Sequence, residues 1–497
     1  MQRDGNPPPS CRIYGASRPA GELMQRWHLT LGLAVTAVAA AVVVPDLRGP
    51  QLPAPGPTPG PAPAPPSGSD ILPPQPAGDA SGRLGLKATI DQSALLQGSG
   101  EDRFLVIEVD ADAVEGATRR PVHLSVVMDT SGSMAGQGKM THARAAATEL
   151  VGLLGPEDTF SLVTFDDQAA VRLPDRPVTD IPSLQRRIQG IQTGGGTNLY
   201  DGVAAGLDEV GTDPSDGVRR VVVLSDGRAN IGVTDAGSLR RQAGSMVAEG
   251  VTISAIGIGV DYNEDLLAAM ADAGGGAYRF VDSPGSLTAM FTEELQQLSS
   301  VVARQTQLSI NLADGVVLHE VYGYDIARSQ DGYSVLLGDL YSGETKKLVA
   351  RVSVPDSSLG AVEVARVQVT HTDADAGTPH EASVAVAGTV TEDTRMASAS
   401  INQDALKQAT RAQVGTMVDS AARNYAKGDV AANQADYRRA VKLVEAYTAN
   451  FEDEDMLQSL GYLESERQAF QAAPPASASG RAQVKKAKEG ARALSRH

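Results

Sequence analysis

The sequence of 497 residues contains a single cysteine, Cys11, and this scarcity excludes two kinds of protein. One cysteine cannot form an intramolecular disulfide, and it cannot supply a cysteine-based zinc cluster. Only seven histidines are present and no His-Glu-x-x-His run occurs, which argues against a zinc protease. Aromatic residues make up 4% of the chain, so its hydrophobic cores must be built mainly from Val, Leu, Ile and Ala.

Basic residues are fewer than acidic ones: 43 Lys and Arg stand against 60 Asp and Glu, which gives a formal net charge of −17. Binding to nucleic acid requires a basic face that neutralises phosphates, so we expect no nucleic-acid partner. An acidic composition suits a soluble, exported body that attracts cations. At roughly 150 residues per domain, the length suggests about three folded units.

The N-terminal part carries an export signal. Residues 29–44 form an uncharged apolar run of 16 residues; four arginines precede it, and Arg48 is the only Lys or Arg in the next 30 positions. This asymmetry predicts that residues 1–28 are cytoplasmic and the rest lies outside. The run is either an uncleaved anchor or a signal segment cleaved at Ala37-Val38-Ala39. We favour a single-pass inner-membrane anchor with the body in the periplasm or extracellular space; cleavage would give a secreted protein.

Residues 45–81 form a proline-rich linker. Proline at this density favours an extended polyproline II conformation over a packed fold. We interpret this segment as a spacer between the membrane and the folded body.

Over residues 120–302, apolar strands alternate with helices. Two of the strands, Arg219 to Ser225 and Val251 to Ile258, are almost continuously apolar, which is typical of a parallel sheet covered by helices on both faces. The pattern predicts a doubly wound α/β domain with a mostly parallel sheet. Its last element is predicted to be a long helix from Ser286 to about Val302.

Residues 303–395 alternate apolar and polar side chains in six short segments, which predicts an antiparallel β-sandwich. Residues 82–118 contain two more such segments that need partners from elsewhere. We therefore expect the α/β domain to be inserted in the sandwich or followed by it.

The C-terminal residues 400–472 are predicted to be helical. Helices over 405–426 and 430–447 should pack as a helical hairpin, with a Lys427-Gly428-Asp429 turn that suits a helix end and a new helix start. A third helix is expected over 457–470. The last 17 residues hold six Lys or Arg against one Glu. We interpret residues 473–497 as a basic disordered tail rather than an arm that binds membrane or nucleic acid.

Three segments at predicted strand or helix ends carry side-chain oxygens. The run from Val122 to Met134 is a buried-strand pattern that leads into Asp129, Ser131 and Ser133. Carboxylates and hydroxyls at the carboxyl end of a strand suit a hard cation such as Mg²⁺. Alone, this run is equally compatible with a helix cap.

The other two segments follow further along the chain. The glycine-rich run TGGGTN presents Thr197 before a helix, and LSDG places Asp226 at the end of an apolar strand. Each is weak alone, since glycine-rich loops and Ser-Asp-Gly turns are common.

Together, DTSGSM, GGGTN and LSDG in this order resemble the metal-ion-dependent adhesion site of the von Willebrand factor type A domain, over about residues 121–302. The resemblance implies that Ser131, Ser133 and Thr197 ligate Mg²⁺, or Mn²⁺ or Ca²⁺, through their hydroxyls. It implies that Asp129 and Asp226 act directly or through waters. It also implies that a partner protein presents an Asp or Glu carboxylate to the ion.

The flanking parts more weakly resemble bacterial membrane-attached proteins related to calcium-activated chloride channel regulators and inter-alpha-trypsin inhibitor heavy chains. We therefore expect an extracytoplasmic, membrane-attached binding protein that is not an enzyme.

Three alternatives stay open. A metal-dependent hydrolase would need a base, but no histidine lies within these loops, and Asp166 and Asp167 read as a solvated pair. There is also no Gly-x-Ser-x-Gly or Walker A run. A subunit of an ATPase-coupled metal chelatase would be cytoplasmic, which the export signal opposes. The third alternative is a structural envelope protein whose metal only stabilises the fold.

Overall fold

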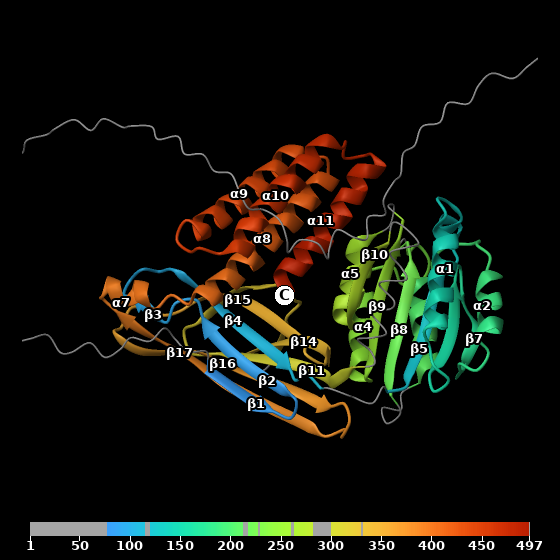
Figure 1. Ribbon diagram of the computed structural model, residues 1–497, viewed down its shortest axis with the longest axis horizontal. Coiled ribbons are helices and arrows are strands. Elements are labelled where there is room, and N and C mark those ends of the chain that lie inside the picture. Colours follow the sequence, from blue (N-terminus) through green and yellow to red (C-terminus); the bar gives the residue numbers. More distant parts are fainter. Residues whose placement is uncertain are drawn as a thin grey trace, which may run out of the picture. The chain divides into compact units, whose positions relative to one another are not determined.

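The computed structural model describes residues 77–114, 120–211, 217–226, 229–259, 263–281, 300–329 and 332–496 (Figure 1). The predicted cytoplasmic segment, the apolar run 29–44 and the linker up to residue 76 lie outside these residues, as do residues 286–299 of the predicted long helix. Among the residues that the structure describes, no helix combines the length and the hydropathy that crossing a membrane requires.

A six-stranded sheet forms the centre of the α/β domain. Its strand order is β10 (Gly275–Val281), β9 (Val251–Ile258), β8 (Val218–Ser225), β5 (Val122–Asp129), β6 (Thr159–Phe165) and β7 (Ala169–Pro177). All neighbouring strands are parallel except β6 and β7. Every residue of β8 and β9 is buried, because helices cover both faces.

The helices divide between the two faces of this sheet. The first core includes residues of α1 (Lys139–Gly152) and α2 (Ile181–Gln189). The second includes residues of α3 (Leu199–Val210), α4 (Ala236–Ala248) and α5 (Glu264–Ala273). The predicted doubly wound α/β fold is confirmed.

Two sheets form the sandwich, and neighbouring strands in them are antiparallel except for β17 (Pro379–Thr391) and β3 (Ala94–Leu96), which are parallel. The first has the order β1 (Ala77–Ser81), β2 (Leu84–Ile90), β4 (Asp102–Ala111), β15 (Thr345–Ser353) and β12 (Val317–Tyr322). The second has the order β13 (Ala327–Ser329), β14 (Gly332–Tyr341), β11 (Val301–Leu312), β16 (Gly360–Asp373), β17 (Pro379–Thr391) and β3 (Ala94–Leu96). Because β4 pairs with β15, strands from before and after the α/β domain share one sheet. The α/β domain is therefore inserted in the sandwich, which was one of the two predicted arrangements.

Two predicted boundaries are wrong. Residues 77–81, predicted to end the linker, form β1 and pair with β2. Val301 and Val302, predicted to end a helix, begin β11, where Val301 pairs with Tyr341 of β14. β-branched side chains fit a strand better than a helix, and here the neighbouring strand decides the outcome.

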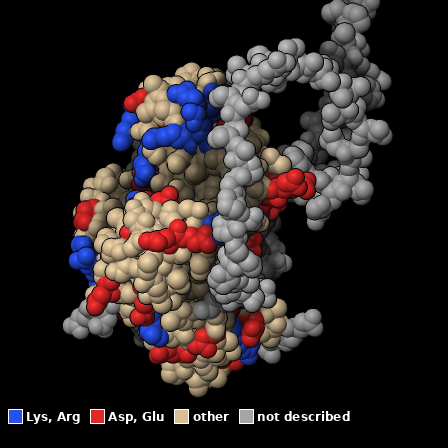
Figure 2. All heavy atoms as spheres, turned by 90° about the vertical axis from the view of Figure 1, so that its left-hand side faces the viewer, with Lys and Arg blue, Asp and Glu red and all other residues tan. Residues whose placement is uncertain are grey.

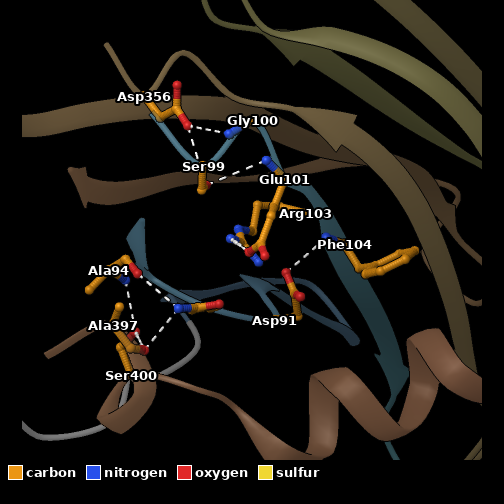
Figure 3. Close-up of polar contacts among 11 residues, drawn as sticks. Asp91, Ala94, Ser99, Gly100, Glu101, Arg103, Phe104, Asp356, Ala397 and Ser400 are labelled. Carbon is orange, nitrogen blue, oxygen red and sulfur yellow. Dashed lines mark hydrogen bonds and ion pairs between the residues drawn. The ribbon is translucent and has the colours of Figure 1, made fainter. Parts of the chain in front are cut away.

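Hydrogen bonds join the connection between β2 and β4, which includes β3, to later parts of the chain (Figure 3). Asp356 Oδ2 accepts hydrogen bonds from the Gly100 N–H at 2.8 Å and from the Ser99 hydroxyl at 3.3 Å. Ser400 Oγ accepts a hydrogen bond from the Ala94 N–H at 2.9 Å. These bonds join segments that flank the inserted domain in sequence, so they hold the sandwich together across the insertion.

The C-terminal region contains five helices. They are α7 (Thr394–Ala399), α8 (Gln403–Ala426), α9 (Val430–Thr448), α10 (Glu454–Ala472) and α11 (Ala478–Arg496). The predicted hairpin of α8 and α9 is confirmed, with the Asp429 side chain accepting a hydrogen bond from the Ala432 N–H. Figure 2 shows Lys and Arg side chains gathered over these helices on one face, so the net negative charge is unevenly spread.

The prediction of a disordered basic tail over 473–497 is wrong, because α11 packs on α8. Val484, Ala487 and Ala491 of α11 are buried in the core of the helical region. A Cβ added to Gly415 of α8 would lie 2.6 Å from the Ala491 carbonyl oxygen, so glycine permits the close approach of the two helices. The tail was misjudged because alanines rather than large apolar residues mark its buried face.

The basic residues of α11 face acidic residues of α5. Lys485 Nζ lies 3.0 Å from Glu264 Oε2, and Lys488 Nζ lies 2.9 Å from Glu264 Oε1 and 2.7 Å from Asp265 Oδ1. Burial alone would raise the pKa of the Glu264 carboxyl, but the two ammonium groups outweigh it and lower the pKa to about 2, from an ordinary value of 4.5. These ion pairs therefore attach the helical region to the α/β domain.

Glu264→Gln is expected to lower the free energy of unfolding at pH 7 by about 3 kcal/mol, because the depressed pKa is lost with the carboxylate. A carboxylate whose pKa falls on folding stabilises the fold above its unfolded pKa and loses that effect as pH drops. The variant should therefore also flatten the decline in stability between about pH 4.5 and pH 2.

Urea unfolding at pH 7 and at pH 3 measures both effects. Glu454→Gln is the matched control, since Glu454 is the exposed first residue of α10 as Glu264 is the first residue of α5. Equal losses in the two variants would show that the lysines of α11 do not hold Glu264.

Candidate metal centre

The predicted site residues lie at the carboxyl edge of the parallel sheet. Asp129 ends β5, and Asp226 follows β8, which is paired in register beside it. The chain continues from β5 to β6 on one side, and β8 lies on the other side. Ligand sites of open α/β sheets lie where the strand order reverses in this way.

Asp129 is fully buried and organises the first loop. Its Oδ1 accepts a hydrogen bond from the Ser131 N–H at 2.9 Å, and its Oδ2 accepts one from the Ser225 hydroxyl at 2.6 Å. Burial raises the pKa of Asp129 to about 6, and the nearby charge of Asp226 acts in the same direction. Asp129 thus ties the loop after β5 to the end of β8.

Ser131 and Ser133 place two hydroxyls side by side. Their Oγ atoms are 3.0 Å apart, Ser131 is buried and Ser133 is half-buried at the start of the short 3-10 turn η2 (Gly132–Ala135). Backbone hydrogen bonds join this loop to the glycine-rich one: Gly132 N–H donates to the Gly195 carbonyl and Gly194 N–H to the Thr130 carbonyl. The first two loops therefore form one surface.

Thr197 is buried at the end of the glycine-rich loop, just before α3. Its N–H donates to Asn230 Oδ1 at 2.8 Å, and its carbonyl oxygen accepts a hydrogen bond from the Asn230 N–H at 3.1 Å. A Cβ added to Gly196 would lie 2.4 Å from Ile231 Cδ1 and 2.9 Å from Asp167 Oδ1, so a larger residue there would require these side chains to move. Residues of the segment that follows β8 therefore hold the glycine-rich loop in place.

Asp167 has a bracing role that the sequence reasoning missed. It is exposed, as predicted, but its Oδ1 accepts a hydrogen bond from the Gly196 N–H at 2.6 Å. The Asp166 carbonyl oxygen accepts a hydrogen bond from the Asn198 N–H at 2.7 Å. The pair is therefore not simply solvated, because it holds the loop that carries Thr197.

Asp226 is fully buried and forms an ion pair with a residue the sequence reasoning also missed. Its Oδ2 lies 3.0 Å from Lys139 Nζ, and the lysine side chain is 6% exposed. Lys139 is the first residue of α1, where the helix dipole disfavours a cation, and that position was the signal that could have revealed it. The Asp226 carbonyl oxygen accepts a hydrogen bond from the Asn263 N–H, just before α5.

These residues fit a hard divalent cation. The other carboxylate oxygen of Asp226, Oδ1, is buried and accepts no hydrogen bond from the described residues. Two carboxylates and three hydroxyls form an all-oxygen donor set of the kind Mg²⁺ prefers. Among the described residues, no three His, Cys, Asp or Glu side chains cluster as metal ligands, so a cation here would depend on the hydroxyls.

Comparison with known proteins agrees with this geometry. The profile of the von Willebrand factor type A domain matches residues 123–293. An uncharacterised protein of Synechocystis sp. is 26% identical over 306 residues, which cover 58% of this chain and 72% of that protein. Human inter-alpha-trypsin inhibitor heavy chain H4 is 27% identical over 186 residues, covering 35% of this chain but only 20% of that protein.

Among solved structures, a von Willebrand factor type A protein from Catenulispora acidiphila superposes with a TM-score of 0.62. The two chains are 19% identical, and the match covers 80% of this chain and 90% of the other. At this identity the likeness shows the fold, which here extends well beyond the α/β domain.

Proposed function

We propose, from the premise that residues 123–293 form a von Willebrand factor type A domain, that this protein captures a protein ligand through a divalent cation held at the metal centre. The observation that carries the proposal is the buried Oδ1 of Asp226, which accepts no hydrogen bond from the part of the chain that the structure describes, beside loops that present three hydroxyls. A buried carboxylate oxygen without a hydrogen-bond donor is costly unless a cation compensates it.

The residues have distinct roles in this proposal. Ser131, Ser133 and Thr197 would hold the ion through neutral hydroxyls, and Asp129 and Asp226 would balance its charge. When bound, the ion supplies a positive centre that attracts a carboxylate although the chain as a whole is acidic. We therefore propose a partner that presents an Asp or Glu side chain, with Mg²⁺ as the first candidate ion and Mn²⁺ or Ca²⁺ as alternatives.

The site is better suited to binding than to catalysis. Nucleophilic catalysis by serine needs a base within hydrogen-bond reach of the hydroxyl. The hydroxyls of Ser131 and Ser133 hydrogen-bond to each other, and the buried amine of Lys139 is paired with Asp226. The carboxylate beside Ser131 is that of Asp129, which in this proposal balances the charge of the ion. We propose that the protein is not an enzyme.

We further propose that the body acts outside the cytoplasm, attached to the membrane by its N-terminal segment. The support is the apolar run 29–44 with its excess of arginine on the N-terminal side. The proline-rich residues that follow would set the binding domain away from the membrane surface.

The function is tested by immobilising the full chain and exposing it to an envelope extract with Mg²⁺ or with EDTA. A specific partner should be retained with Mg²⁺ and released by EDTA. Thr197→Val should lose this capture, because it removes a buried hydroxyl while keeping the shape of the side chain.

Thr252→Val is the matched control, since Thr252 is also buried but lies at the start of β9, at the opposite edge of the sheet. Capture that persists in EDTA, or that the control loses equally, would contradict the proposal. Metal-dependent turnover of an ester, phosphate or peptide by the purified chain would favour the hydrolase instead.

A further inference from the structure

A cavity of about 680 Å³ lies on the far side of the α/β domain from the metal centre. Its wall includes Arg220 near the start of β8, residues 275–279 of β10, residues of β14, and Arg492 and Arg496 of α11. The cavity therefore lies where the α/β domain, the sandwich and the last helix meet. Its volume falls in the range of about 300–1,000 Å³ that is usual for small-molecule sites.

The wall of this cavity is predominantly basic. Seven Lys or Arg side chains line it against four Asp or Glu, which leaves three more positive than negative charges in a chain whose net charge is −17. Cationic side chains that line a concave surface concentrate anions there. The balance of charge therefore favours a negatively charged occupant.

The inner basic groups are held in place by hydrogen bonds to neutral groups, and Lys346 Nζ also lies 4.0 Å from Glu344 Oε1. The fully buried Arg220 donates hydrogen bonds to Ser254 Oγ at 2.8 Å and to the Tyr341 hydroxyl at 2.7 Å. Lys346 Nζ donates to the carbonyl oxygens of Leu337 at 2.6 Å and Asp339 at 2.9 Å. Fixed groups of this kind are preorganised, so less conformational entropy is lost when a ligand binds.

On the opposite wall, Arg492 presents an unsatisfied donor. Its guanidinium lies over the Tyr278 ring, 5.1 Å from the centroid, and its Nη2 is 3.5 Å from Asp272 Oδ2. Arg496 contacts the same carboxylate at 2.9 Å, so one anion serves two guanidiniums. Arg492 Nη1 is buried and donates to no acceptor among the described residues. Because the Arg492 side chain is 32% exposed, a small rotation of its guanidinium would bring this donor to an oxyanion in the cavity.

We propose that this cavity binds a small oxyanion with at least two negative charges, carried by phosphoryl or carboxylate groups. Guanidinium groups match both chemistries, because their paired N–H donors fit two oxygens at once. The anion would contact α11 and the α/β domain together and so strengthen their attachment. The proposal is independent of the metal centre and of the function proposed for it.

The test is calorimetric titration of the full chain, stripped of metal and dialysed into chelator-free buffer, with sodium pyrophosphate and, separately, with citrate, at constant ionic strength. Removing divalent cations beforehand keeps the metal centre out of the measurement without adding a competing polycarboxylate. Saturable binding of one anion per chain, with a rise in melting temperature, is expected for at least one probe. Tighter pyrophosphate binding would assign the phosphoryl class, and tighter citrate binding the polycarboxylate class.

Arg240 of α4 also lines the cavity, where it forms an ion pair with Asp325. Arg492→Gln with Arg240→Gln should weaken the binding by about ten-fold or more, as expected when charged hydrogen bonds are lost. Arg240→Gln alone changes no residue of α11 and should weaken anion binding by a smaller factor. This single variant distinguishes a direct loss of binding from a loss caused by detachment of α11. Arg186→Gln with Arg187→Gln is the control, since both residues are exposed on α2. Absence of saturable binding by both probes, or an equal loss in the control, would overturn the proposal.

Discussion

Lys139→Met is expected to make the folded state depend on a divalent cation. The Lys139 ammonium is 3.0 Å from Asp226, and the two side chains are 6% and 0% exposed. Removing the lysine leaves the Asp226 carboxylate buried without its counter-charge, close to the second buried carboxylate of Asp129. Breaking a buried ion pair by removing one partner costs about 3–5 kcal/mol. Methionine retains most of the aliphatic length, so the effect should come from the lost charge rather than from a cavity.

A bound cation should restore most of this loss, because it can replace the ammonium as the counter-charge of Asp226. A ligand that binds only the folded state stabilises it in proportion to the logarithm of its concentration over Kd. Urea unfolding of the wild type and of Lys139→Met, in EDTA and in excess Mg²⁺, measures the effect. The variant should be strongly destabilised in EDTA and close to the wild type in Mg²⁺.

Lys442→Met is the control for this experiment, since Lys442 is exposed on α9. It should show the same stability in both buffers as the wild type. If Lys139→Met were equally unstable with and without the cation, Lys139 would be a structural residue with no relation to a metal site.

The sequence predicted the strands of the α/β domain from local patterns, and the five oxygen-bearing residues from three short motifs that resemble those of the von Willebrand factor type A domain. An apolar run such as Val218–Ser225 marks a buried strand, and the next residue, Asp226, then lies at the carboxyl edge of the sheet. The structure brings the three loops together because the carboxyl ends of parallel strands share one edge of the sheet.

Contacts between distant segments could not be predicted in the same way. The partner of Lys139 is 87 positions away, and nothing near the lysine in sequence identifies it. The pairing of Thr345 in β15 with Asp110 in β4 spans 235 positions across the inserted domain. The local pattern of small and basic residues in α11 resembles that of a solvated tail. What stabilises the helix is an ion pair with Glu264 of another domain, and the sequence near α11 does not show that partner.

Replacing both Ser131 and Ser133 by alanine is expected to abolish cation binding while leaving the fold nearly intact. The two hydroxyls hydrogen-bond to each other at 3.0 Å, so removing both leaves neither of them unpaired. Loss of paired polar groups of this kind changes stability by about 1 kcal/mol or less. Losing two of the three hydroxyl ligands should lower the affinity for the ion by more than the roughly 10–100-fold that mutations of outer-shell residues cause.

The control variant, Ser183→Ala with Ser459→Ala, removes two hydroxyls on α2 and α10, away from the three loops. It should retain the affinity of the wild type for the cation. Urea unfolding confirms that both double variants are folded, so that any difference in binding reports on the site.

The most direct test of the metal centre is titration of the full chain with Mn²⁺, with the free ion followed by electron paramagnetic resonance. The wild type and the control should bind one Mn²⁺ per chain with the same affinity, and Mg²⁺ should compete for it. The Ser131→Ala, Ser133→Ala variant should show no saturable binding over the same range. Binding of equal affinity by that variant would contradict the assignment of the cation to these hydroxyls.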